Sequence, residues 1–173
     1  ENNTLTEKLN YEPVRKGDVF YIPSGTIHAI GKGILIAEIQ ENSNTTYRVY
    51  DYNRKDKDGN TRPLHIEKAL DVANLSPAPQ QERHDTEMYF ENPAKILCKC
   101  DYFIVIKIEI RRGTVNLFAD ASSFHHILVI DGEGNIECGD EKIEVKKGSS
   151  IFIPAGNGVY KISGKLDIIC TKV

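Results

Sequence analysis

Two stretches of this sequence decide its fold: VRKGDVFYIPSGTIHAIGKGILIAEIQ at residues 14–40 and VKKGSSIFIPAGNGVYKISGKLDIICT at residues 145–171. They align without a gap and share eight identical residues, half of which are glycine or proline. Glycine adopts backbone conformations that other residues avoid, so its repetition at expected turns indicates a repeated shape. The sequence therefore predicts that one strand–turn–strand unit is built twice.

Short segments rich in β-branched and aromatic residues, separated by turn residues, make up most of the chain. Many short strands at regular spacing are typical of an antiparallel sandwich or barrel. We predict strands at residues 19–22, 26–30, 34–40, 45–52, 95–100, 102–111, 113–120, 125–130, 134–138, 142–145, 150–153 and 166–172.

One segment has the pattern of a helix. Residues 62–75 place Pro63 in an expected first turn, and apolar residues follow at helical spacing. Residues 76–94 are polar and contain prolines, which favours a connector. We therefore expect a first body at residues 1–75, a connector at 76–94 and a second body at 95–173.

The composition disfavours several classes of protein. The 22 basic and 25 acidic residues leave a net charge of −3, which argues against nucleic-acid binding through a basic surface. No apolar run approaches the roughly 20 residues that span a bilayer, so we expect no membrane partner. The four cysteines lack the spacing of zinc or redox motifs, which favours reduced thiols in the cytoplasm. Because the chain starts without methionine, we interpret it as a piece of a longer protein.

The two copies of the repeat differ at residues that can carry chemistry. His28 in the first copy aligns with Val159 in the second, and Glu38 aligns with Ile169. A buried ionisable group is costly unless it is paired or bound to a metal. Since the second copy does without both groups, we favour a functional role for them. For His28 we expect a metal ligand, and the alternative is a hydrogen-bonded core histidine.

Two further polar residues accompany this pair. Gln40 lies two positions after Glu38 on an expected strand, so both side chains point to the same face. Arg48 lies on the next expected strand, and its fixed fork of donors suits a phosphate or a developing oxyanion. The alternative for Arg48 is a salt bridge at the rim of a barrel.

Parts of both copies resemble cupin motifs. KGD…IPSGTIHAI resembles the second cupin motif, which ends in a metal-binding histidine, and FHHILVIDGEGNIE at residues 124–137 resembles the first, with paired glycines at a hairpin. The resemblance implies a mainly β protein with two cupin-like jelly-roll barrels, the first incomplete, joined by the helix and the polar connector. The adjacent His125 and His126 would point to opposite faces, so at most one can enter the second barrel. We expect that barrel to be metal-free and structural.

Residues 13–75 resemble, in more detail, the C-terminal half of bacterial class I mannose-6-phosphate isomerases, specifically at PSGTIHAI, EIQENS and TYRVYDYNR. The resemblance implies zinc-dependent interconversion of mannose 6-phosphate and fructose 6-phosphate through an enediol. It assigns His28 as the last zinc ligand and Glu38 and Arg48 as catalytic residues. It also implies that Gln40 and Arg48 contact the sugar-phosphate substrate.

The family's remaining zinc ligands, a Gln-x-His pair and a Glu, and its catalytic lysine have no match here. Because catalytic zinc needs about three protein ligands, we expect an inactive fragment with an incomplete zinc site, derived from an isomerase. One alternative is a non-catalytic sugar-phosphate-binding or regulatory cupin pair. Another is a metal-dependent cupin oxygenase, which would need histidines shortly before Lys16, and residues 1–13 contain none. The oligomeric state stays open.

Overall fold

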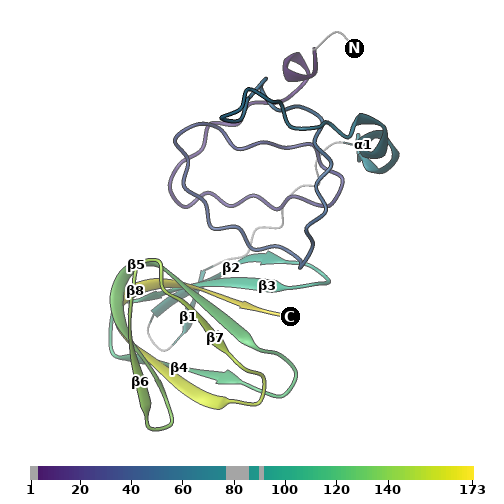
Figure 1. The fold of residues 1–173 in the computed structure, drawn as a ribbon. Coiled ribbons are helices and arrows are strands. Elements are labelled where there is room, and N and C mark those ends of the chain that lie inside the picture. The colour runs from purple at the N-terminus through teal and green to yellow at the C-terminus, as the bar shows by residue number, and fades with distance from the viewer. Residues whose placement is uncertain (1–3, 77–85, 90–91) are drawn as a thin grey trace. The chain divides into compact units, whose positions relative to one another are not determined.

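The computed structural model describes residues 4–76, 86–89 and 92–173 and divides the chain into two compact units. The first unit comprises residues 1–81 and the second comprises residues 82–173 (Figure 1). Nearly all of the regular secondary structure belongs to the second unit. None of the helices in the described part of the chain is long and apolar enough to cross a bilayer.

The second unit is one antiparallel sheet of eight strands that curls on itself (Figure 1). The sheet has the strand order β1-β2-β3-β8-β5-β6, while β4 also pairs with β8 and β7 with β5. The two longest strands, β5 and β8, therefore each pair with several other strands. The strands are β1 (Thr86–Tyr89), β2 (Asn92–Lys99), β3 (Ile104–Ile110), β4 (Thr114–Ala119), β5 (His125–Cys138), β6 (Glu141–Lys146), β7 (Ser150–Ile153) and β8 (Gly158–Lys172).

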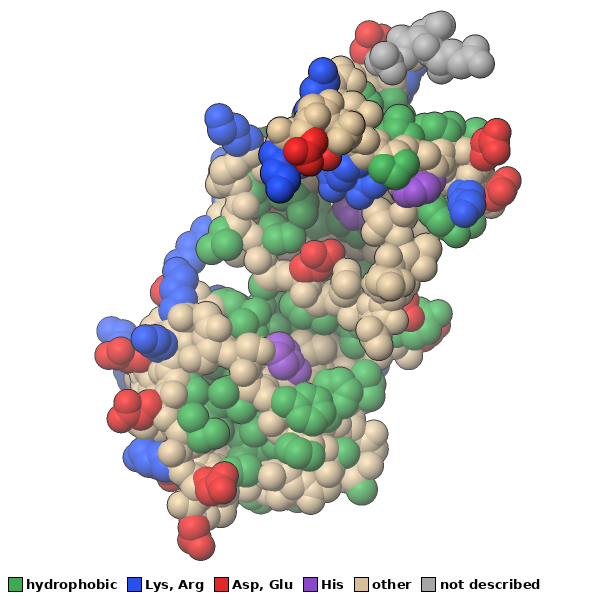
Figure 2. Space-filling model, in the orientation of Figure 1, with side chains coloured by type: hydrophobic (Ala, Val, Ile, Leu, Met, Phe, Trp, Pro, Cys, Tyr) green, Lys and Arg blue, Asp and Glu red, His purple; other side chains and the backbone are tan. Residues whose placement is uncertain are grey.

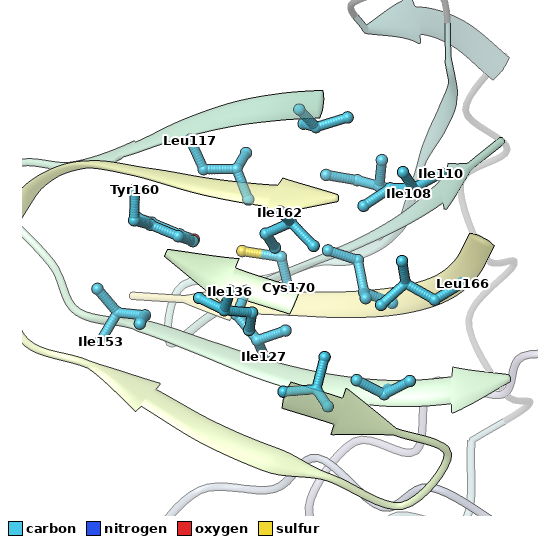
Figure 3. Packing of buried hydrophobic residues seen from close by; sticks show 14 of the residues in the cluster. Ile108, Ile110, Leu117, Ile127, Ile136, Ile153, Tyr160, Ile162, Leu166 and Cys170 are labelled. Carbon is cyan, nitrogen blue, oxygen red and sulfur yellow. The ribbon is translucent and has the colours of Figure 1, made fainter. Parts of the chain in front are cut away.

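Buried and exposed side chains alternate along these strands, and the buried ones form the core of the second unit. In β4, every second side chain is buried, so Val115, Leu117 and Ala119 face inward. Tyr160 and Ile162 of β8 are fully buried in the same cluster. Figure 3 shows Leu117, Tyr160 and Ile162 meeting aliphatic residues from the other strands in one continuous interior. The sequence prediction of an antiparallel, mainly β body is confirmed here.

The paired glycines of the 124–137 stretch serve a different purpose from the predicted one. They do not form a hairpin, because β5 runs through them without ending. A Cβ atom at Gly132 would lie 2.1 Å from the Lys165 carbonyl oxygen, and one at Gly134 would lie 2.1 Å from that of Ser163. Only glycine allows this close approach of β5 to β8.

The first unit contains extended segments without a sheet. The strands predicted at 19–22, 26–30, 34–40 and 45–52 do not form, and within residues 4–76 the only pairing is an isolated bridge between Lys55 and Thr61. The prediction was wrong because strand-like sequence also needs a hydrogen-bonding neighbour. In the second copy, β7 and β8 obtain theirs from β3, β4 and β5. Residues 4–76 offer no such strands.

The aligned glycines of the two copies share one backbone feature. All the aligned glycines adopt positive φ angles, a region that favours glycine. The predicted strand–turn–strand unit is nevertheless not built twice, because residues 14–40 form no strand and Gly164 lies inside β8. The pairs are Gly17 and Gly148 at 97° and 89°, Gly25 and Gly156 at 85° and 76°, and Gly33 and Gly164 at 79° and 125°.

Helical structure is short. A 3₁₀ turn, η1, covers Leu5–Glu7, and α1 covers Ile66–Val72, so the helix occupies only the middle of the predicted range 62–75. Pro63 lies before the helix rather than in its first turn. Residues 86–89 and 92–94, which were predicted as part of the connector, belong to β1 and β2. Residues 77–85 of that predicted connector lie outside the residues that the structure describes.

Candidate functional site

His65, the residue directly before helix α1, is attached to the segment that carries Arg48. The backbone N–H of Arg48 donates to Nδ1 of His65, at 3.1 Å, and the backbone N–H of His65 donates to the carbonyl oxygen of Arg48, at 2.7 Å. The Arg48 guanidinium donates to the Pro63 carbonyl oxygen at 3.4 Å. Arg48 is half-buried. Its backbone and its side chain are therefore both fixed by the residues that lead into α1.

The other end of α1 is attached to the turn that precedes His28. The backbone N–H of Asn74 donates to the Gly25 carbonyl oxygen at 2.9 Å. A Cβ atom at Gly25 would lie 2.5 Å from the carbonyl oxygen of Val72, so no larger residue fits at this contact. One short helix thus connects the backbone segments that carry two of the predicted site residues.

His28 is exposed, and one of its ring nitrogens is already engaged. Nδ1 lies 2.8 Å from the carbonyl oxygen of Thr26. A carbonyl oxygen can only accept, so Nδ1 must carry the proton. Nε2 then has a free lone pair, which is the arrangement that metal-binding histidines adopt.

A buried ion pair fixes the loop after Arg48. Asp51 is only 6% exposed, and the guanidinium of Arg62 donates to both of its carboxylate oxygens, with Nε at 2.8 Å from Oδ2. Arg54 adds a contact of 3.0 Å to Oδ1. The hydrogen bond from Arg62 holds the pKa of Asp51 below its usual value. Such bidentate pairing orders the chain between residues 51 and 62.

The structure leaves the four predicted site residues unconnected. His28, Glu38 and Gln40 are exposed, whereas Arg48 is half-buried. Among the described residues, no hydrogen bond or ion pair joins these four to one another. The described part of the chain also holds no group of three His, Cys, Asp or Glu side chains able to bind a metal. The assignment of these residues to one site therefore stays a prediction.

Sequence reasoning missed His65 and Asp51, which hold Arg48 and the loop after it. The available signals were the histidine inside the predicted helix at 62–75 and the single acid between Arg48 and Arg54. In the second unit, the expectation for the adjacent histidines is confirmed. His125 is buried and bonded to the Tyr160 hydroxyl, while His126 is only partly buried and its Nε2 lies 2.7 Å from Ser150 Oγ.

Comparison with known proteins identifies the relatives of this chain. Residues 94–173 match the family model described as "Mannose-6-phosphate isomerase, cupin domain". The chain is 40% identical over 174 positions to mannose-6-phosphate isomerase ManA of Bacillus subtilis, and the match covers 98% of this chain and 53% of ManA. It is 39% identical to the mannose-6-phosphate isomerase of Streptococcus mutans, with 92% of this chain and 49% of the relative covered.

A solved structure agrees with these matches. The crystal structure of mannose 6-phosphate isomerase from Bacillus subtilis superposes with a TM-score of 0.68 at 32% identity, covering 76% of this chain and 41% of that one. The chain spans about half the length of the curated relatives that it matches. Over that half, it belongs to the mannose-6-phosphate isomerase family of cupin proteins.

Proposed function

We propose that this chain carries part of the catalytic site of a cytoplasmic, zinc-dependent mannose-6-phosphate isomerase. The enzyme would interconvert mannose 6-phosphate and fructose 6-phosphate through an enediol. The observation that supports this most strongly is the identity of 40% to ManA over 98% of the chain, which includes the segments with His28, Glu38 and Arg48. The four free thiols agree with a reducing compartment.

The chemistry of His28 fits a zinc ligand, but this chain does not offer a complete set. Its Nε2 is the nitrogen with a free lone pair, because Nδ1 lies 2.8 Å from the Thr26 carbonyl oxygen. Catalytic zinc sites use about three protein ligands, so further ligands must come from outside the described residues. When bound, zinc would polarise the oxygens of the sugar as a Lewis acid.

The remaining chemistry belongs to the side chains of the same unit. Aldose–ketose interconversion moves a proton between C1 and C2 and places negative charge on an enediol oxygen. Glu38 would move that proton, a contribution typically worth roughly 10²–10⁴-fold in rate. Gln40, two residues further along, would hydrogen-bond the sugar. Arg48 would stabilise the developing charge or hold the phosphate, and its backbone is kept in place by His65.

The test joins this chain to the half of ManA that it does not match. The 173-residue chain alone should bind zinc weakly and show no turnover of mannose 6-phosphate. The joined protein should be active, and Arg48→Met should lower kcat by roughly 10²-fold or more. Arg54→Met, which removes a nearby exposed arginine, should retain activity and serves as the matched control.

Two results would contradict the proposal. Turnover by the isolated chain would show that its own residues suffice. A joined protein that folds and binds mannose 6-phosphate without converting it would favour the alternative, a non-catalytic sugar-phosphate-binding cupin pair.

A further inference from the structure

A pocket of about 250 Å³ lies within the second unit and is formed only by residues of that unit. Strands β2, β3 and β4 supply most of its lining, which is aliphatic. Phe118 and Cys170 also line it, together with two groups that can carry positive charge, His125 of β5 and Lys172 of β8. The aliphatic residues that line it are Ala94, Ile106, Ile108 and Leu117.

His125 is held rigidly and has one ring nitrogen to spare. The residue is 7% exposed, and its Nδ1 lies 2.8 Å from the hydroxyl oxygen of Tyr160, which is fully buried. Among the described residues, Nε2 has no hydrogen-bond partner, and the ring lines the pocket. Because solvent reaches Nε2, a ligand group in the pocket can bond it in place of water.

The Tyr160 hydroxyl that bonds His125 also bonds Cys170. Tyr160 bonds the Cys170 thiol, and burial raises the pKa of that thiol to about 11, so it keeps its proton at neutral pH. Figure 3 shows Tyr160 and Cys170 in the same interior. The Tyr160 hydroxyl can donate to Nδ1 of His125, and in that tautomer Nε2 of His125 carries the proton. The histidine thus offers a donor to the pocket.

Lys172 adds a positive charge, which acts on the nearby carboxylate of Asp120 and, after the hydrogen bonds from Ser122, helps to lower its pKa. Lys172 is half-buried, and among the described residues it forms no ion pair. Burial lowers the pKa of His125, and the charge of Lys172 lowers it further. The opposing acid is Asp120, whose carboxylate accepts hydrogen bonds from the backbone N–H of Ser122, at 2.8 Å, and from its hydroxyl. An anion in the pocket would therefore meet a cation and a neutral donor.

We propose that this pocket binds a small carboxylic acid with a short apolar chain. The chain would lie against the aliphatic wall, and the carboxylate would contact Lys172 Nζ and His125 Nε2. A sugar phosphate fits poorly, because its hydroxyl groups would face aliphatic side chains that cannot satisfy them. The volume of about 250 Å³ is below the roughly 300–1,000 Å³ of pockets for drug-sized ligands, which favours a compact molecule. This inference does not depend on the isomerase proposal.

Titration of the 173-residue chain with hexanoate, followed by calorimetry and by NMR of the His125 ring, tests the proposal. Hexan-1-ol has the same chain without the charge and should bind at least about fivefold more weakly. Mannose 6-phosphate should not shift the His125 signals. Lys172→Met should weaken hexanoate binding about fivefold or more, whereas Lys161→Met, at an exposed position of the same strand, should not change it.

A second variant guards against a folding defect in Lys172→Met. Ala94→Leu fills the pocket with aliphatic atoms, so it should abolish hexanoate binding without lowering the thermal midpoint of the second unit. The proposal is overturned if hexanoate produces no saturable shift at His125, if hexan-1-ol binds equally well, or if Lys172→Met binds like the unsubstituted chain. Unchanged binding by Ala94→Leu would show that any hexanoate site lies elsewhere.

Discussion

Gly25→Ala tests whether α1 holds the turn before His28. Gly25 has a φ of +85°, and an added Cβ would lie 2.5 Å from the Val72 carbonyl oxygen and 3.1 Å from the Asn74 backbone nitrogen. The backbone must therefore move, which breaks the hydrogen bond between Asn74 N–H and the Gly25 carbonyl oxygen. We expect the C-terminal end of α1 to detach from the turn.

Gly33→Ala is the matched control for the cost of the backbone conformation alone. Its φ is +79°, but an added Cβ meets nothing within 4 Å. Both substitutions carry a similar conformational cost of about 1–2 kcal/mol. Only Gly25→Ala also loses a hydrogen bond, worth about 0.5–1.5 kcal/mol net, which corresponds to a factor of roughly 2–10 in the local opening equilibrium.

Amide hydrogen exchange over residues 66–74 measures this factor. The backbone N–H groups of Ala73 and Asn74 donate to Ala69 and Gly25, so both should be protected in the unsubstituted chain. In Gly25→Ala they should exchange faster than in Gly33→Ala by the factor above. Equal exchange in the two variants would refute the proposed attachment of α1 to the turn.

Three further predictions concern groups with shifted pKa values. Cys170 is 3% exposed, and its thiol has a pKa of about 11. Iodoacetamide at mildly alkaline pH should therefore alkylate Cys170 last among the four thiols, as followed by mass spectrometry. Early modification of Cys170 would contradict its burial. The hydrogen bond from Arg62 is the main cause of the low pKa of Asp51. In a carboxyl NMR titration, Arg62→Met should therefore raise the pKa of Asp51 more than Arg54→Met does. The reverse order would be inconsistent with the geometry. Burial lowers the pKa of His125, so the unfolded chain binds this proton more readily, and stability should fall as pH decreases below the ordinary histidine value of about 6.5. Denaturation midpoints between pH 7 and 5 should therefore fall less steeply for His125→Gln than for the matched His126→Gln, and equal slopes would sink this explanation.

The sheet of the second unit could be predicted from sequence because each of its strands has its partners within the same stretch of chain. Alternating segments such as Thr114–Ala119 were found within one residue of their ends. Strand β1, TEMY, was missed because it lacks an apolar alternation. The predicted strand at 166–172 begins earlier, at Gly158, since the glycines that suggested turns lie inside β8.

The first unit shows what periodicity alone does not determine. Residues 34–40 have the pattern of a strand, but Leu35 is 91% exposed, and within the described parts of the chain the segment pairs with no strand. The surface of the second unit also carries apolar side chains, which are green in Figure 2. Phe118 and Phe152 are 60% and 61% exposed. A hydrophobic pattern in the sequence identifies the face of a segment that can be buried. Burial of that face also requires another element to pack against it.

The candidate site was predictable only as a set of residue types. Comparing His28 with Val159 identified a histidine that packing does not require, and the bond to the Thr26 carbonyl explains which nitrogen it presents. The supports of Arg48 could not be predicted, because His65 contacts it across 17 positions of sequence. Such contacts follow from tertiary structure rather than from any local signal.

The central claim is that His28 ligates the zinc of an isomerase through Nε2. The most direct measurement is ¹⁵N NMR of the His28 ring, with zinc content measured in parallel, in the active protein that joins this chain to the unmatched half of ManA. We predict a metal-bound Nε2, a protonated Nδ1 and a loss of bound zinc in His28→Gln. Full zinc content in His28→Gln, or an Nε2 signal unaffected by zinc, would contradict the claim.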